Sequence, residues 1–71
     1  MQYLVVIERG ESSFGAYVPD LPGCIAAAGS EAEVRELIRE AIEFHIEGLR
    51  EAGQSVPTPS SSGTLVDVGA A

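Results

Sequence analysis

Apolar and polar positions divide the chain into three short strands, one long helix and a final apolar segment. Residues 3 to 7 are apolar at every position and rich in β-branched side chains, which predicts a strand covered on both faces. Turn residues follow at positions 9 to 12, and Phe14, Ala16 and Val18 then alternate with the residues between them over residues 13 to 18, so the two segments predict a hairpin. A third short strand is expected over residues 24 to 28, where small side chains would let a helix approach closely.

The start and end signals of the helix are clear. Ser30 and Glu33 match a capping box, in which the two side chains satisfy N–H groups that have no partner at a helix start. Residues 31 to 52 contain no proline, and Gly53 stands where a left-handed C-terminal cap is expected. The sequence therefore predicts one helix over residues 31 to 52.

The apolar side of this helix is wider than one sheet needs. Winding the segment at ~100° per residue spreads its apolar residues over an arc of about 200°. The extra width lies at Phe44 and Ile46, which we therefore predict to form an oligomer interface. The opposite side is an acidic ridge that suits a basic protein partner, although a merely solvated helix face explains the same pattern equally well. The ridge consists of Glu36, Glu40, Glu43 and Glu47.

Proline and serine residues separate the helix from the last apolar segment. Residues 57 to 59 predict an extended stretch and residues 60 to 63 a flexible connection. Residues 64 to 68 then predict a final strand, which pairs either within its own chain or with a neighbour. The expected fold of the single domain, residues 1 to 71, is α+β: a two-layer β-β-β-α-β sandwich with one long helix on a mainly antiparallel sheet.

Charge and composition narrow the range of partners. The net charge is −7 and the four cations are all arginines, so no basic patch is available for phosphates. Direct nucleic-acid binding is therefore not expected, whereas a basic protein partner is favoured. A single cysteine, Cys24, allows no internal disulfide, and no apolar run approaches the ~18 residues of a membrane span. We expect a cytoplasmic protein with no cofactor, no metal and no membrane contact.

The loop between the second and third predicted strands carries two candidate contact residues. Asp20 could pair with a basic residue of a partner while Leu21 serves as an apolar anchor beside it. The alternative, which we favour for Asp20, is a turn aspartate that accepts hydrogen bonds from nearby backbone N–H groups. Three neighbours are expected to set the shape of the loop: Pro19, Pro22 and Gly23.

Catalytic chemistry is not expected from these residues. His45 falls near the centre of the apolar arc and is predicted to be a hydrogen-bonded structural residue, because no partner for catalysis accompanies it. Cys24 is predicted to be a small buried residue, since no base or cation stands beside it to activate a thiolate. The acids outside the helix are too scattered for a two-metal nuclease. They are Glu8, Glu11, Asp20 and Asp67.

Residues 17 to 24, Tyr-Val-Pro-Asp-Leu-Pro-Gly-Cys, close the hairpin before a capped helix and resemble the signature of the HicB-type antitoxins and their short stand-alone relatives. The resemblance continues through Gly29 and Ser30 and through residues 47 to 59. It implies a partial ribonuclease-H-like fold without nuclease activity and a role in capping a small basic mRNA-cleaving toxin of the HicA type. Family members usually add a C-terminal DNA-binding segment, which we do not expect here. The alanines at 26 to 28 depart from a more polar family pattern.

Three functions follow in order of preference. The first is an antitoxin-like binding module, a homodimer or tetramer that sequesters a small basic ribonuclease. The second is an orphan stand-alone relative, a structural or regulatory homo-oligomer without a toxin partner. The third, a metal-dependent nuclease remnant, is the only enzyme among them.

Overall fold

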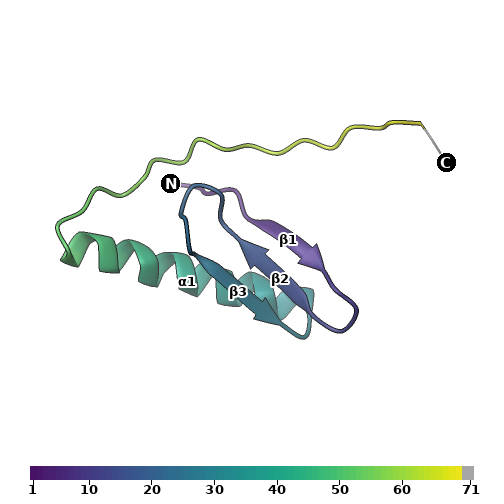
Figure 1. Cartoon of the computed structure of the whole chain (residues 1–71), viewed down its shortest axis with the longest axis horizontal. Coiled ribbons are helices and arrows are strands. Elements are labelled where there is room, and N and C mark those ends of the chain that lie inside the picture. The colour runs from purple at the N-terminus through teal and green to yellow at the C-terminus, as the bar shows by residue number, and fades with distance from the viewer. Residues whose placement is uncertain (70–71) are drawn as a thin grey trace.

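The computed structural model describes residues 1–69 as a three-stranded sheet covered on one face by a single helix (Figure 1). The sheet order is β1-β2-β3, and both neighbouring pairs are antiparallel. This confirms the α+β two-layer architecture. The elements are β1 (Val6–Arg9), β2 (Phe14–Tyr17), β3 (Ile25–Ala28) and α1 (Glu31–Glu51).

Small side chains in the sheet set the position of the helix. Ala16 at the centre of β2 stands opposite Ile7 of β1 on one side and Ala26 of β3 on the other. Since Ala16 and Ala26 project little, α1 approaches closely and lies mainly over β3 and β2. The face of β1 toward the helix is therefore only partly covered.

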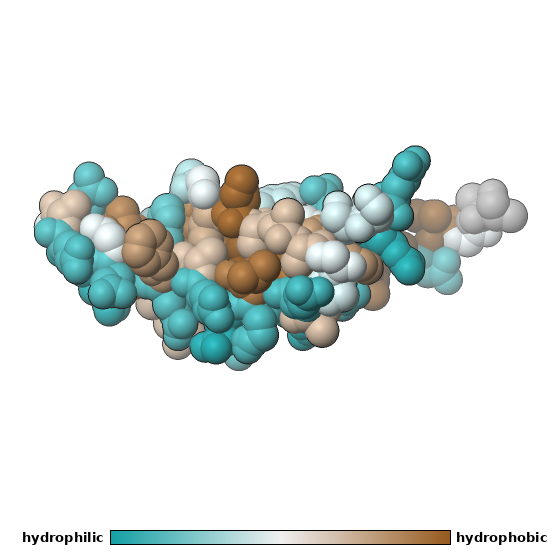
Figure 2. Space-filling view, turned by 90° about the horizontal axis from the view of Figure 1, so that it is seen from below, coloured by the Kyte–Doolittle hydropathy of each residue, from teal (hydrophilic) through white to brown (hydrophobic). Residues whose placement is uncertain are grey.

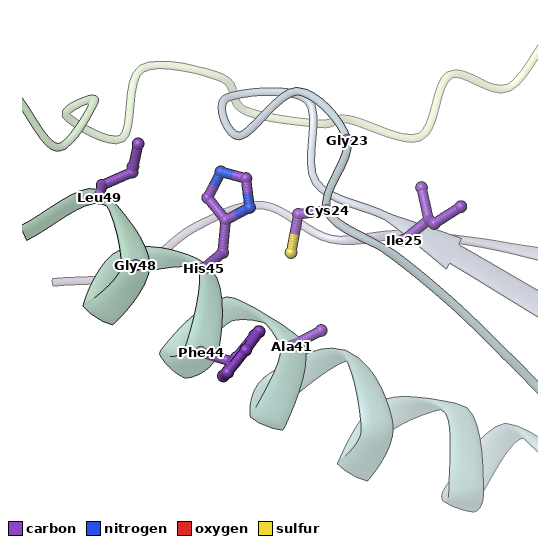
Figure 3. Close-up of a pocket in the computed structure, with 8 residues that line it drawn as sticks. All are labelled: Gly23, Cys24, Ile25, Ala41, Phe44, His45, Gly48 and Leu49. Carbon is purple, nitrogen blue, oxygen red and sulfur yellow. The ribbon is translucent and has the colours of Figure 1, made fainter. Parts of the chain in front are cut away.

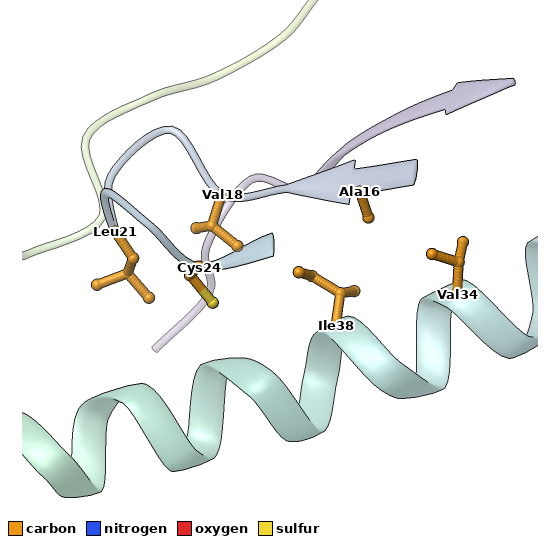
Figure 4. Close-up of a cluster of buried hydrophobic side chains, with 6 residues drawn as sticks. All are labelled: Ala16, Val18, Leu21, Cys24, Val34 and Ile38. Atoms are coloured by element: carbon orange, nitrogen blue, oxygen red, sulfur yellow. The ribbon is translucent and has the colours of Figure 1, made fainter. Parts of the chain in front are cut away.

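The hydrophobic core fills the space between β2, the loop that follows it, and α1 (Figure 4). The buried side chains come from β2 and its loop on one side and from α1 on the other, where the helix contributes two residues one turn apart, as its apolar period requires. The core members are Ala16, Val18, Leu21, Cys24, Val34 and Ile38.

A compact loop between β2 and β3 directs Leu21 into this core. The Leu21 amide donates to the Val18 carbonyl at 3.1 Å, and the Cys24 amide donates to the Leu21 carbonyl at 3.0 Å. Gly23 supports the return of the chain with a φ of 85°, a left-handed conformation that favours glycine. The predicted role of Gly23 in shaping the loop agrees with this geometry.

Both ends of α1 are capped, but of the two side chains expected to bind backbone amides at the helix start only that of Ser30 does so within residues 1–69. The Glu33 amide donates to the Ser30 hydroxyl at 3.2 Å, and that hydroxyl donates to the Glu33 carboxylate at 3.0 Å. At the other end Gly53 has a φ of 70°, and its amide donates to the Arg50 carbonyl at 3.0 Å. The helix ends at Glu51, one residue before the predicted end.

Removing the N-terminal cap tests how much this local signal contributes to stability. Ser30→Ala leaves the Glu33 amide without its acceptor and is expected to lower the free energy of unfolding by about 1 kcal/mol. Urea denaturation followed by circular dichroism measures the change. Ser62→Ala, in the exposed tail, is the matched control and should leave the midpoint unchanged; an equal shift in both variants would contradict the capping role.

The chain after α1 departs from the prediction. Residues 64 to 68 were expected to form a strand, but no strand is present between residues 54 and 69, and the segment runs extended above the sheet (Figure 1). The physical reason is the way this tail is held. The amides of Ser60 and Ser61 donate to the Asp20 carboxylate and Gly63 lies beside the Leu4 side chain, but the chain after Gly63 runs away from β1 and so has no strand to pair with among the described residues (Figure 1).

Candidate protein-binding surface

Asp20 fastens the C-terminal tail to the loop between β2 and β3. Its carboxylate accepts hydrogen bonds from the backbone amides of Ser60 and Ser61, both at 2.9 Å, and from their hydroxyl groups at 3.1 and 2.8 Å. The Ser61 amide contributes most to lowering the pKa of Asp20 to about 2, and the Ser60 amide follows. The expected donors, amides of the same turn, were therefore wrong: the donors lie 40 residues further along the chain.

Leu21 does not reach a partner. Its side chain is 0% exposed and points between the sheet and α1 (Figure 4), so the prediction that it anchors a partner was wrong. The two turns that close the loop rotate this position inward. Asp20 is half-buried and its carboxylate is occupied by its own chain, which makes it a poor candidate for a direct contact.

The predicted acidic ridge lies on the solvent side of α1. Its four glutamates fall within about 60° of one another when the helix is wound at ~100° per residue, directly opposite Val34 and Ile38 of the core. All four are exposed, but Arg39 pairs with two of them, with Glu36 at 3.5 Å and with Glu43 at 3.4 Å. Within residues 1–69 the other two, Glu40 and Glu47, take part in no salt bridge. Four glutamates and Arg39 leave this face of the helix with a net charge of −3, of which Glu40 and Glu47 supply −2.

Phe44 and Ile46 do not share one surface. Two helical positions separate their side chains by ~200° around the axis, so they lie on opposite flanks of the acidic ridge. Phe44 is 79% exposed on the β3 side, whereas Ile46 is half-buried next to Met1 on the other side. Phe44 and Ile46 therefore cannot both belong to one flat oligomer interface on this helix.

On the β3 side, α1 and the start of β3 enclose an open apolar groove of about 460 Å³ (Figure 3). Ile25 and Phe44 border it and are 70% and 79% exposed. A band of apolar residues, bounded by hydrophilic ones, crosses the face of the molecule seen in Figure 2. The groove is lined by Gly23, Cys24, Ile25, Ala41, Phe44, His45, Gly48 and Leu49.

Two side chains in this groove, those of His45 and Cys24, belong to residue types that can take part in catalysis. His45 is half-buried and its imidazole projects into the groove (Figure 3), but no hydrogen bond from it to another of the 69 described residues is present. His45 was predicted to be a hydrogen-bonded structural residue, but it has no hydrogen-bond partner among residues 1–69. Burial raises the pKa of the Cys24 thiol, which keeps the sulfur protonated and a weak nucleophile. The groove is suited to apolar contact.

Most of this groove could not be predicted from the sequence. Ile25 is the one large residue in an otherwise alanine-rich strand, and Gly48 stands one turn after Phe44, where it leaves the groove open. Those two features were the available signals. The alternation of a strand alone does not say that the third strand lies at the sheet edge, so the exposure of Ile25 was not predicted.

Neither metal ligands nor membrane spans come together in the described chain. Residues 1–69 contain no group of three or more histidine, cysteine, aspartate or glutamate side chains placed to hold a metal ion. Over the same residues, no helix is long and apolar enough to cross a bilayer. The acids outside the helix are not assembled either, since Asp20 binds the tail and Asp67 accepts from the nearby Gly69 amide at 3.0 Å.

The fold and surface define an acidic α+β domain that presents an apolar groove instead of an assembled catalytic centre within residues 1–69. Over residues 3–68 the sequence matches the family described as the HicB-like antitoxin of bacterial toxin-antitoxin systems. The chain belongs to this family.

Known proteins with similar sequence and structure agree with that assignment. One chain of a solved structure described as a HicA3 and HicB3 toxin-antitoxin complex superposes with a TM-score of 0.72 and 32% identity, over 84% of this chain and 70% of that one. An uncharacterized 14.9 kDa protein of Haemophilus phage HP1 is 39% identical over 57 residues, which are 80% of this chain and 43% of that relative. The chain thus spans less than half the length of the phage protein.

Short archaeal proteins are also similar. A UPF0150 protein of Archaeoglobus fulgidus is 42% identical over 48 residues, which cover 66% of this chain and 70% of the relative. A UPF0150 protein of Thermoplasma acidophilum is 34% identical over 58 residues, which cover 80% and 84%. The domain described here therefore occurs both as most of a short protein and as part of a longer one.

Proposed function

We propose that this chain is the antitoxin half of a two-protein system and that it sequesters a small basic toxin. The observation that carries the proposal is the exposed apolar groove beside β3, bordered on the same helix by two glutamates without ion-pair partners in residues 1–69. The family assignment and the solved toxin-antitoxin complex support it. The toxin class, a HicA-type mRNA-cleaving ribonuclease, is part of the proposal.

The positions of the charges make the groove selective for a basic partner. Glu40 lies one turn before Phe44 on α1, and Glu47 lies one turn after it, so two carboxylates bracket an exposed aromatic ring. Exposed aromatic residues supply much of the affinity at interfaces, while charges around them steer the partner and fix its orientation. With a net charge of −7, the whole domain attracts a basic toxin at long range.

The proposed role is binding without turnover. Neutralisation needs only that the toxin be held and its substrate excluded, and neither requires a cofactor or a catalytic group on the antitoxin. We place the protein in the cytoplasm, because a toxin that cleaves mRNA has to be held where its substrate lies. Within the proposed role, Glu36 and Glu43 contribute less than Glu40 and Glu47, because Arg39 already pairs with them.

The decisive experiment recovers the partner and then disrupts the groove. Tagged protein is purified from its own cells, small proteins that remain bound at moderate salt are identified by mass, and the basic one is titrated by calorimetry. Phe44→Asp is expected to raise the dissociation constant by at least about 30-fold, the loss typical of one central contact residue. Because Phe44 is exposed, the variant should fold as the parent does.

Ile46→Ala on the opposite flank of α1 is the control for an apolar truncation outside the groove: because Ile46 packs against the core it should lower stability, but it should leave the affinity of the folded protein unchanged. Glu40→Gln with Glu47→Gln should slow association and weaken its dependence on salt. Failure to recover a basic partner would favour the orphan homo-oligomer, and unchanged affinity in Phe44→Asp would move the contact away from the groove.

A further inference from the structure

The C-terminal tail exposes apolar side chains that its own chain does not cover. Val66 and Val68 are 73% and 79% exposed, and Leu65 between Thr64 and Val66 is fully exposed. Residues 64 to 68 form no strand, although the tail is drawn out along its length (Figure 1). Alternate residues of this segment, at positions 64, 66 and 68, are β-branched, which favours a strand, yet the segment pairs with no sheet among the described residues.

On the flank of α1 opposite Phe44, the sheet lacks a strand. β1 pairs with β2 along one edge only, and its other edge is open in the part of the chain that the structure describes. Because α1 lies over β3 and β2, a groove of about 760 Å³ remains between α1 and the segment that leads into β1. Its apolar floor consists of Tyr3, Val5, Ile7, Ile38 and Ile42.

We propose that residues 64–68 of a second copy of this chain fill that groove as a fourth strand, and that the exchange is reciprocal. Alternate residues of a strand face the same side, so Val66 and Val68 would point together onto the apolar floor while Leu65 and Asp67 face away. Five residues at ~3.3 Å each span roughly 17 Å, which is enough to pair with the four residues of β1. One contact would thus pair the open edge of β1 and bury the exposed valines of the tail.

The path of the tail favours a second copy over the tail's own β1. Asp20 fixes the tail at Ser60 and Ser61, and Gly63 lies beside the Leu4 side chain. Beyond this point the tail runs away from the sheet toward the C-terminus (Figure 1). Reciprocal exchange buries both tails in one symmetric contact, which is the commonest arrangement of a dimer. The proposal does not depend on a toxin.

Sedimentation equilibrium on the full chain tests the proposed dimer by comparing the parent with variants of the tail. The parent should form a dimer, and Val66→Asp with Val68→Asp should raise its dissociation constant at least about 100-fold, because two carboxylates would have to enter an apolar groove. These two positions are exposed in the single chain, so its circular dichroism spectrum should not change. Ser55→Asp with Ser62→Asp adds the same charge outside the strand and should leave the dimer intact.

A sample mixed from isotope-labelled and unlabelled protein then identifies which chain supplies the strand. Nuclear Overhauser contacts from Val66 and Val68 methyl groups to Val5 and Ile7 should pass between chains. A monomeric parent, a dimer that survives the valine changes, or the same contacts within one chain would each overturn the proposal. A dimer broken by Ile46→Glu but not by the tail variant would do so as well, and would place the interface on the helix edge.

Discussion

Leu21→Ala is expected to lower the free energy of unfolding by about 2 to 5 kcal/mol, the range for truncating a buried leucine. Leu21 is completely buried although it belongs to a loop, and it is the largest side chain that closes this end of the core. A domain of this size has a total stability of roughly 4 to 11 kcal/mol. The variant therefore loses a large share of this stability, and only where the parent lies at the low end of the range is it expected to be partly unfolded at 25 °C.

Ile25→Ala is the matched comparison, because it removes a similar side chain four residues away that is 70% exposed. It should change stability by less than about 0.5 kcal/mol, the range of ordinary surface substitutions, while weakening the binding of a partner in the groove. Urea denaturation followed by circular dichroism measures both variants. A loss below about 1 kcal/mol for Leu21→Ala would mean that the loop is not part of the core.

Local interactions explain which parts of the fold were predictable. The capping box at Ser30 and the left-handed Gly53 involve groups within four residues of each other, so the sequence alone indicated the helix and its ends to within one residue. The second and third strands lie within the predicted segments, whereas the first, predicted over residues 3 to 7, is shifted to Val6–Arg9. It starts later because residues 3 to 5 have no partner strand once β2 ends at Tyr17 opposite Val6, and it continues to Arg9, which was predicted as a turn residue, because Arg9 pairs with Phe14. It is also an edge strand and not a strand covered on both faces.

Contacts between distant segments explain what was not predictable. The loop motif indicated a turn at Asp20 and Leu21, but which of the two side chains points inward depends on the hydrogen bonds that close the loop and on where α1 passes beneath it. The donors to Asp20 are two serines 40 residues away, in a segment whose composition suggested only a flexible connection. No pattern within a short window contains that pairing.

The surface of the helix was predictable in part. Helical winding indicated correctly that the acidic ridge is exposed and that the apolar arc is too wide for the sheet. It did not say on which flank the sheet would end, which follows from the order β1-β2-β3 and from the small residues that draw α1 toward β3. Phe44 and Ile46 were therefore grouped in one interface, although they border different surfaces.

Asp20→Ala is expected to release the tail while leaving the core intact. Four hydrogen bonds to Ser60 and Ser61 disappear together, so the amides of both serines should exchange with solvent at least about 10-fold faster. Amide hydrogen exchange followed by nuclear magnetic resonance measures this directly. Glu11→Ala removes an exposed loop carboxylate and is the control; protection that persists in Asp20→Ala would show that other contacts hold the tail.

Acid should have the same effect as the substitution, in a defined range of pH. Hydrogen bonds lower the pKa of Asp20 from 3.8 to about 2, so the folded chain with its tail attached favours the ionised carboxylate. The stabilisation is fully present above about pH 4 and is lost as the pH falls through about 2, because only then does the anchored carboxylate take up a proton. A titration of the Asp20 carboxyl carbon shift should have its midpoint near 2, and the Ser60 and Ser61 amide shifts should move with it.

The double variant Ser60→Ala with Ser61→Ala separates the hydroxyl groups from the backbone donors, which remain. Its midpoint should therefore rise only part of the way toward the ordinary value of 3.8. A full return to that value would mean that the hydroxyl groups, and not the amides, stabilise the charge.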